Sequence, residues 1–375
     1  MTTDRFIRGG SPGLSRRAFG VGLLGAGVIG AIGLPTSGRT VPSVKVVGFG
    51  GAGGKVIAAM IRSGIAGVDY VAVDTDADAL RGALASTTVH IAPVLLAVAT
   101  GKRTADFGQA RPADHPDRGR LAEALAGADL VVLVGGLSTG TGSGVAVLVA
   151  DVAREVGAVV AAVVTYEGGN ARGRQTAHGV QGLTALGVPI VAWPMKRLLA
   201  CHRVPLEFME EEQVDAILAL ADHQLGVTAR ALADLTPSFL DPMRFAFASR
   251  PGLAFAGTSS ARVEEFDGDV ALGRGAAERA ICTPLVNLEA MVATAPWIVV
   301  NVACPRGFDQ AVEGALAEVR RLAPRKSKVV FGVTRDDALM DEVRVTVIAG
   351  GASARSERWW WARRRREDEG RHDVG

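Results

Sequence analysis

The stretch Gly135-Gly136-Leu137-Ser138-Thr139-Gly140-Thr141-Gly142-Ser143-Gly144 lies between an apolar run and a helical pattern. The run Leu130–Val134 is typical of a buried strand, and Val145–Val156 is predicted to form a helix. A strand, a glycine-rich turn and a helix point backbone N–H groups at an anion, because glycine allows close approach and a helix N-terminus is partly positive. Thr141 and Ser143 add hydroxyl groups. A flexible linker is the alternative, but the flanks are not polar coil, so we predict a phosphate-binding turn.

A second glycine cluster supports this prediction. Gly48-Phe49-Gly50-Gly51-Ala52-Gly53-Gly54-Lys55 follows the apolar run Val44–Val47 and precedes the helical stretch Val56–Arg62. Taken alone, its glycine spacing fits any dinucleotide-binding fold, and Asp74, at the end of the run Tyr70–Val73, could then bind a ribose. A dinucleotide-dependent oxidoreductase is therefore one hypothesis, although it leaves the first cluster unexplained.

Apolar runs alternate with helical patterns through the first half of the chain. The runs are Val44–Val47, Tyr70–Val73, Leu130–Val134, Val159–Val164 and Ile190–Trp193. Such runs predict a Rossmann-like α/β fold, with a parallel sheet covered by helices on both faces. Ligands of these sheets bind at the carboxyl ends of the strands, where both glycine clusters lie.

A long helix and a smaller α+β domain are predicted to follow. Helical spacing of apolar residues extends from about Leu206 to Leu235, and Thr236-Pro237 ends it. Helices are predicted over Ala276–Val292 and Gln310–Leu322, and strands over Trp297–Val302, Lys328–Gly332 and Glu342–Ile348. The predicted boundaries are a leader at 1–42, a nucleotide-binding domain at 43–205, a central helix at 206–236, a C-terminal domain at 237–351 and a basic tail at 352–375.

Together these stretches resemble the tubulin/FtsZ family of GTPases, and FtsZ more than tubulin. Val73-Asp74-Thr75-Asp76-Ala77-Asp78-Ala79-Leu80 is similar to a family segment, and Ser138–Gly144 matches the family signature except that Thr139 replaces a glycine. Further similarity runs through Arg279–Leu285 to Asp341–Ala349. The resemblance implies an FtsZ fold that binds GTP or GDP, and it leaves open whether Mg²⁺ is also bound. It also implies head-to-tail filaments of this chain or assembly with another FtsZ.

The resemblance also implies where the nucleotide binds. The candidate residues are Gly50, Gly51, Ala52, Gly53, Gly54, Lys55, Asp74, Ser138, Thr139, Gly140, Thr141, Gly142, Ser143, Gly144, Arg174 and Asp222. Asp222 would accept the N1–H and amine of guanine and repel adenine, or else it is a solvated acid on a long helix. Ala171 stands where the family has a ribose-binding Glu, and Met195 where it has a nucleoside-binding Asn. We therefore expect weaker nucleoside contacts than the family norm.

The loop after the central helix departs furthest from the family pattern. In FtsZ this loop carries carboxylates that activate water at the nucleotide of the neighbouring subunit. Here the aspartate positions fall on Met243 and Ala246, and Asp241 is left as a weak catalytic candidate in the place of an asparagine. Loss of a general base typically slows a reaction about 10²–10⁴-fold, so impaired hydrolysis is expected. A non-catalytic module that co-assembles with or regulates a true FtsZ is a further hypothesis.

Charge separates the two ends from the core of this 375-residue chain. The net charge is +2. Segments 1–39 and 352–375 together contain 12 of the 41 basic residues and 6 of the 39 acidic residues. The core therefore has 29 basic and 33 acidic residues, which argues against nucleic-acid binding. Three scattered cysteines and six histidines without paired spacing indicate no disulfide framework or metal site.

Both ends are candidates for membrane-related roles. Ser15-Arg16-Arg17-Ala18-Phe19 precedes the glycine-rich apolar run Gly20–Leu34, which is the layout of a twin-arginine export signal. The tail joins Trp359–Trp361 to Arg363–Arg366, which suits an anionic membrane surface, although a disordered basic tail is an equal alternative. The family resemblance implies a cytoplasmic protein, the residues of the two ends indicate a possible membrane contact, and export is the alternative.

Overall fold

The fold is described from a computed structural model. The structure describes residues 42–64, 67–92, 115–138, 140–166, 171–200, 210–234, 253–283 and 285–350. The predicted leader, the tail, the Asp241 loop and Thr139 lie outside these residues.

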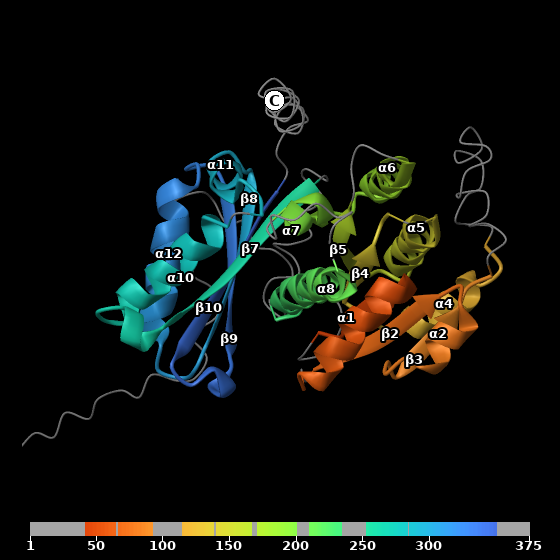
Figure 1. Ribbon diagram of the computed structural model, residues 1–375, viewed down its shortest axis with the longest axis horizontal. Helices are drawn as coiled ribbons and strands as arrows, with labels where there is room; N and C mark the ends of the chain where they lie inside the picture. The colour runs from red at the N-terminus through yellow and green to blue at the C-terminus, as the bar shows by residue number, and fades with distance from the viewer. Residues whose placement is uncertain are drawn as a thin grey trace, which may run out of the picture. The chain divides into compact units, whose positions relative to one another are not determined.

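The described residues contain a ten-stranded sheet in the order β3-β2-β1-β4-β5-β6-β7-β10-β8-β9 (Figure 1). Its strands are β1 Val44–Phe49, β2 Val68–Asp74, β3 Thr87–His90, β4 Leu130–Gly136, β5 Val159–Tyr166, β6 Ile190–Pro194, β7 Leu253–Arg262, β8 Trp297–Cys304, β9 Lys328–Arg335 and β10 Glu342–Gly350. The first six strands are parallel, whereas β10 is antiparallel to both β7 and β8. The five apolar runs of the first half are thus strands, and the predicted α/β fold class is confirmed.

Helices cover the sheet. They are α1 Gly50–Arg62, α2 Ala77–Arg81, α4 Arg118–Leu125, α5 Gly140–Glu155, α6 Ala171–Ala185, α7 Met195–Ala200, α8 Glu211–Ala233, α10 Asp269–Ile281, α11 Leu288–Val292 and α12 Asp309–Leu322, with short 3₁₀ helices η4 Val263–Glu265 and η5 Asp337–Leu339. In the first half, α1 and α8 share one buried cluster with the sheet, and α4 and α5 share another. Strands β4 and β5 are buried along nearly their whole length, as expected for strands with both faces covered.

The second half joins the first through strand pairing. β6 pairs with β7 in parallel through Ile190–Leu253 and Val191–Ala254. Helices α10, α11 and α12 pack in a third buried cluster with β8 and β10. The cluster that contains α8 also includes Trp297 and Ile348, so this helix shares its core with both halves.

One predicted helix is wrong. The pattern over Ala276–Val292 is divided in the structure, where α10 ends at Ile281 and α11 begins at Leu288. Pro284 lies in the interval, and a proline inside a helix removes a hydrogen bond and clashes with the preceding turn. Asn287 then starts α11, because its side chain accepts a hydrogen bond from the backbone N–H of Ala290 at 3.3 Å.

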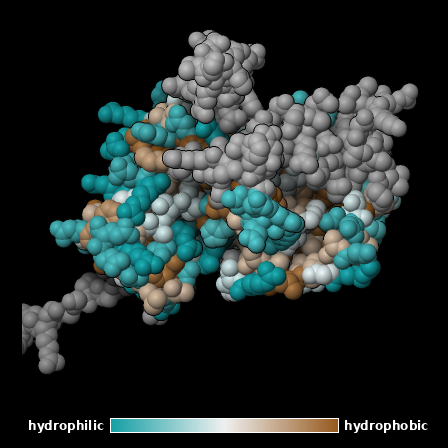
Figure 2. All heavy atoms as spheres, in the orientation of Figure 1, coloured by the Kyte–Doolittle hydropathy of each residue, from teal (hydrophilic) through white to brown (hydrophobic). Residues whose placement is uncertain are grey.

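The surface drawn in Figure 2 is largely hydrophilic over the described residues, with hydrophobic residues in small groups. None of the described helices has the length and apolar character needed to cross a bilayer.

Candidate functional site

The strand register brings the two glycine clusters together. Phe49, the last residue of β1, pairs with Gly135 of β4 on one side and with Val73 of β2 on the other. Gly136 in turn pairs with Thr165 of β5. The segments that follow these strands therefore start side by side, at the carboxyl edge of the parallel sheet.

Helices α1, α5 and α6 begin at this edge with no acidic residue in their first turns, and the first turns of α4 and α7 also have none. By contrast, α8, α10 and α12 carry Glu211, Asp269 and Asp309 in their first turns, which is the usual complement to a helix dipole. The N-cap residue of α1 is Phe49, and its side chain makes no capping hydrogen bond. Backbone N–H groups at the start of α1 are thus available to an anion, with no acid in the same helical turn to repel it.

The glycines of the Gly48–Gly54 cluster serve two different purposes. A Cβ atom on Gly53 would lie 2.6 Å from the carbonyl oxygen of Val134, and one on Gly48 would lie 2.5 Å from that of Gly53. These two glycines let α1 pack directly on β1 and β4. A Cβ atom on Gly51 or Gly54 would instead meet nothing within 4 Å. These two positions leave open space beside the helix N-terminus, as a bound phosphate would require.

Leu137 anchors the Gly135–Gly144 cluster, a role that sequence reasoning missed. Its backbone N–H donates to the carbonyl of Thr165 at 3.1 Å, and its carbonyl accepts from Ser143 Oγ at 2.7 Å and from Thr176 Oγ1 at 3.4 Å. The Leu137 side chain is fully buried. Leu137 is the single apolar residue in a run of Gly, Ser and Thr, and this feature of the sequence could have indicated its buried, structural role. The Ser143 hydroxyl therefore helps to shape this turn.

Asp74 organises the end of β2. Its Oδ1 atom accepts the backbone N–H groups of Thr75 at 2.7 Å and Asp76 at 3.2 Å, and the residue is buried. This is a local turn around an Asp side chain. The carboxylate that the oxidoreductase hypothesis would place on a ribose is thus engaged by its own backbone.

Asp222 of α8 and Lys55 of α1 lie within electrostatic range of each other. Burial raises the pKa of Asp222 to about 6, and the positive charge of Lys55 acts in the opposite direction. These residues are 167 positions apart in the sequence, and the packing of α8 with α1 brings them together behind the Gly48–Gly54 cluster.

The remaining candidates lie at the starts of two helices. Gly140, Thr141, Gly142, Ser143 and Gly144 form the start of α5, and Arg174 lies in the first turn of α6. The side chains of Thr141 and Arg174 are outside the described part, as is Asp241. Among the described residues, no three His, Cys, Asp or Glu side chains gather in a way that could hold a metal ion.

Known proteins share this fold. Residues 43–187 match the family model described as the GTPase domain of the tubulin/FtsZ family. FtsZ from M. jannaschii, solved as an empty dimer, is 25% identical over 84% of this chain and 89% of that one, with a TM-score of 0.65. A mutant of M. jannaschii FtsZ gives 23% identity and a TM-score of 0.67 over 84% of this chain and 93% of the other. CetZ2 from Haloferax volcanii, solved as a GTPγS-bound protofilament, gives 20% identity and a TM-score of 0.62 over 88% and 99% of the two chains.

Proposed function

We propose that the chain, whose residues 43–187 match the model of the GTPase domain of the tubulin/FtsZ family, binds a guanine nucleotide and self-assembles as a cytoskeletal or cell-division protein, with impaired hydrolysis. One observation supports the proposed nucleotide site. Helices α1 and α5, which have no acidic residue in their first turns, begin in the glycine clusters that follow the neighbouring strands β1 and β4. Such N-termini bind phosphate through backbone N–H groups. The match to this family goes against the dinucleotide-dependent oxidoreductase.

Guanine selection is proposed to depend on Asp222. Its partly buried carboxylate lies near Lys55, which helps to keep it charged beside a bound nucleotide. Ala171 and Met195 lack the polar side chains that family members place against ribose and base. Binding should therefore depend mainly on the phosphates. Mg²⁺ would be held by phosphate oxygens and water, which is common for this ion.

Self-assembly is supported by the relatives, since one similar FtsZ was solved as a dimer and one similar CetZ as a protofilament. The alternative is a non-catalytic module that co-assembles with an ordinary FtsZ. The absence of acids at Met243 and Ala246 favours that alternative as much as it favours slow hydrolysis. We further propose a cytoplasmic location, with the basic ends at an anionic membrane.

The phosphate site is tested by adding single methyl groups where the folded chain has room for them. Gly51→Ala and Gly54→Ala place a Cβ atom in open space, so both variants should fold at least as well as the unaltered chain. They should weaken GTP and GDP binding roughly tenfold or more, because the methyl group occupies the approach of the phosphate. Titrations with GTP, GDP and ATP measure this effect.

Gly119→Ala is the matched control. Gly119 lies in α4, and its added Cβ atom also meets nothing within 4 Å. This variant should bind nucleotide like the unaltered chain. If neither GTP nor GDP binds the unaltered chain, or if the Gly51 and Gly54 variants bind as well as Gly119→Ala, the proposed site is wrong.

A further inference from the structure

The carbonyl group of Leu137 accepts hydrogen bonds from two buried residues on different helices. Ser143 Oγ of α5 donates to it at 2.7 Å, and Thr176 Oγ1 of α6 donates at 3.4 Å. These two residues are 2% and 3% exposed, respectively. Ser143 belongs to the glycine cluster itself, whereas Thr176 is 39 positions away from Leu137 in the sequence. The hydroxyl group of Thr176 therefore ties a separate helix to the turn between β4 and α5.

A second contact places α6 directly on this turn. A Cβ atom on Gly179 would lie 3.0 Å from Ser143 Oγ and 3.2 Å from Leu137 Cδ2. Thr176 and Gly179 are three residues apart in α6, so they share one face of the helix. Helices α5 and α6 pack side by side, with this face of α6 toward the turn (Figure 1). The hydrogen bond of Thr176 thus belongs to a close-packed contact between α6 and the turn.

The direction of the Leu137 carbonyl determines the direction of the next N–H group. In a planar trans peptide the C=O and N–H bonds point in opposite directions. The carbonyl of Leu137 points at the buried hydroxyl groups, so the N–H group of Ser138 points away from them. Ser138 is partly exposed, and it forms no hydrogen bond with another described residue. This N–H group is therefore an available donor in the turn that the proposed function assigns to phosphate.

We propose that Thr176 is a positioning residue for nucleotide binding, which holds the Leu137 carbonyl inward and the Ser138 N–H group toward a bound phosphate. If the peptide between Leu137 and Ser138 rotated, the carbonyl oxygen would face the anion and repel it. The hydroxyl group of Thr176 opposes that rotation, because the rotated carbonyl would lose a buried hydrogen bond. The inference rests on the phosphate site of the proposed function, and it adds a residue of α6 that acts without touching the ligand.

Thr176→Val tests this role, because valine has nearly the shape of threonine but no hydroxyl group. Titrations of the full chain should show that this variant binds GTP and GDP about three- to tenfold more weakly than the unaltered chain, as expected for the loss of one neutral hydrogen bond. Thr176→Ser keeps the hydroxyl group and should bind within about twofold of the unaltered chain. A residue that only filled space would give the opposite order, since valine keeps the volume that serine loses.

Thr346→Val is the matched control. Thr346 of β10 is also 3% exposed, and its hydroxyl group bonds that of Thr258 at 3.0 Å, between strands of the C-terminal half. This variant should bind both nucleotides like the unaltered chain. If Thr176→Val binds as tightly as Thr346→Val, or if Thr176→Ser binds as weakly as Thr176→Val, the proposal is overturned and the phosphate site stands. If the unaltered chain binds neither GTP nor GDP, the phosphate site is wrong and the proposal is overturned with it.

Thr176→Ala repeats the test should the valine variant fail to fold. Alanine also lacks the hydroxyl group, and it is the residue most favoured in a helix. This variant should bind GTP and GDP more weakly than Thr176→Ser, and equal affinities of the two would overturn the proposal. Urea unfolding of each variant establishes that the chain is folded under the conditions of the titrations.

Discussion

Burial of Asp222 favours the protonated form of its carboxyl group, whereas the proposed contact with guanine requires the ionised form. Its pKa is raised to about 6 in the folded chain, from an ordinary value of 3.8, because burial disfavours the charged form. A raised folded pKa means that this group contributes stability below about pH 4 and that the contribution is lost as the pH rises through about 6. At neutral pH the free chain thus holds an ionised acid that a bound guanine would use.

We expect Asp222→Asn to be more stable than the unaltered chain at pH 7.5 without nucleotide. The difference should be on the order of 1 kcal/mol, after allowance for the solvent exposure of this side chain, and should disappear below about pH 4. The same variant should lose preference for GTP over ATP. Urea unfolding at both pH values and parallel titrations measure the two effects. Asp215→Asn, an exposed acid on the same helix, should change neither, and equal behaviour of the two variants would contradict the role given to Asp222.

Within elements, the starts of α1 and α5 show what sequence patterns could and could not predict. The patterns placed these helices from Val56 and Val145, whereas they begin at Gly50 and Gly140 inside the glycine clusters. Glycine is a poor helix former, so propensity argues against these first turns. The close packing of Gly53 against Val134 requires glycine there, and this tertiary contact is not visible in a local pattern.

The candidate site was predictable where it depends on strand ends, and less so where it depends on distant partners. Apolar runs followed by glycines located the carboxyl edge of the sheet correctly. The family resemblance supplied Asp222, but the proximity of Lys55 arises from packing between α1 and α8. Strand β7, Leu253–Arg262, was not predicted because its polar residues Thr258, Ser259 and Ser260 obscure the apolar pattern.

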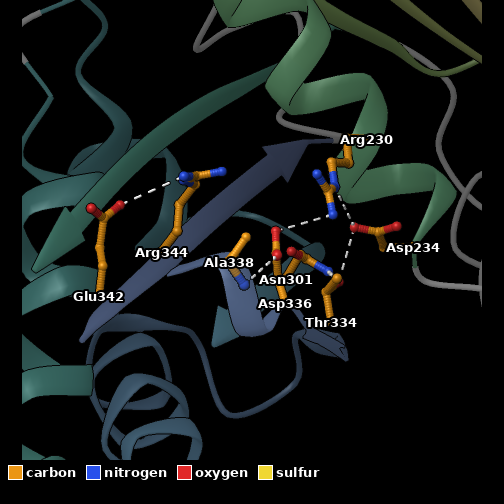
Figure 3. Close-up of polar contacts among 8 residues, drawn as sticks. All are labelled: Arg230, Asp234, Asn301, Thr334, Asp336, Ala338, Glu342 and Arg344. Carbon is orange, nitrogen blue, oxygen red and sulfur yellow. Dashed lines mark hydrogen bonds and ion pairs between the residues drawn. The ribbon is translucent and has the colours of Figure 1, made fainter. Parts of the chain in front are cut away.

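One cation, the Arg230 side chain, pairs with two carboxylates at the end of α8. Arg230 pairs with Asp234 and with Asp336, each at 3.3 Å, while Thr334 Oγ1 donates to Asp234 at 3.0 Å (Figure 3). Burial raises the pKa of Asp234, and Arg230 and the Thr334 hydrogen bond oppose that rise. Arg230 therefore compensates a charge that burial alone would disfavour.

Two substitutions distinguish the loss of the Arg230 cation from the loss of the charge on Asp234. Arg230→Ala leaves a largely buried carboxylate uncompensated and should cost about 3 kcal/mol of unfolding free energy at neutral pH. Because Arg230 lowers the pKa of Asp234, its removal should make the loss smaller at pH 5 than at pH 8. Asp234→Asn keeps an acceptor without the charge and should cost less than about 1 kcal/mol. Chemical unfolding at the two pH values checks both, and equal costs would contradict this account of the pair.

For the whole molecule, the continuous sheet and α8 connect the candidate nucleotide edge to the C-terminal half. β6 pairs with β7, and the core around α8 includes Trp297 and Ile348 of the C-terminal strands. In the proposed function, the nucleotide is bound at this edge and the segment after α8 meets a neighbouring subunit. The proposed assembly then places the nucleotide of one subunit against the Met243 and Ala246 segment of the next.

This arrangement predicts slow hydrolysis that depends on which subunit donates the segment. A polymer of this chain alone should release phosphate slowly, because Met243 and Ala246 cannot activate water. In mixtures with an ordinary FtsZ, hydrolysis at this chain's nucleotide should occur only where the ordinary subunit donates its acidic loop. Phosphate release per subunit, followed together with light scattering, measures both cases.

Carboxylates restored at the two positions test the same mechanism within this chain. Met243→Asp combined with Ala246→Asp should raise phosphate release by about 10²-fold or more, because a positioned general base typically contributes that much. Met243→Asn combined with Ala246→Asn has similar size and polarity without the charge, and should leave release slow. If the Asp variant binds nucleotide and assembles but releases phosphate no faster than the Asn variant, the two positions do not face the nucleotide. Rapid release by the unaltered chain would show instead that another group, with Asp241 the nearest acid in sequence, activates the water.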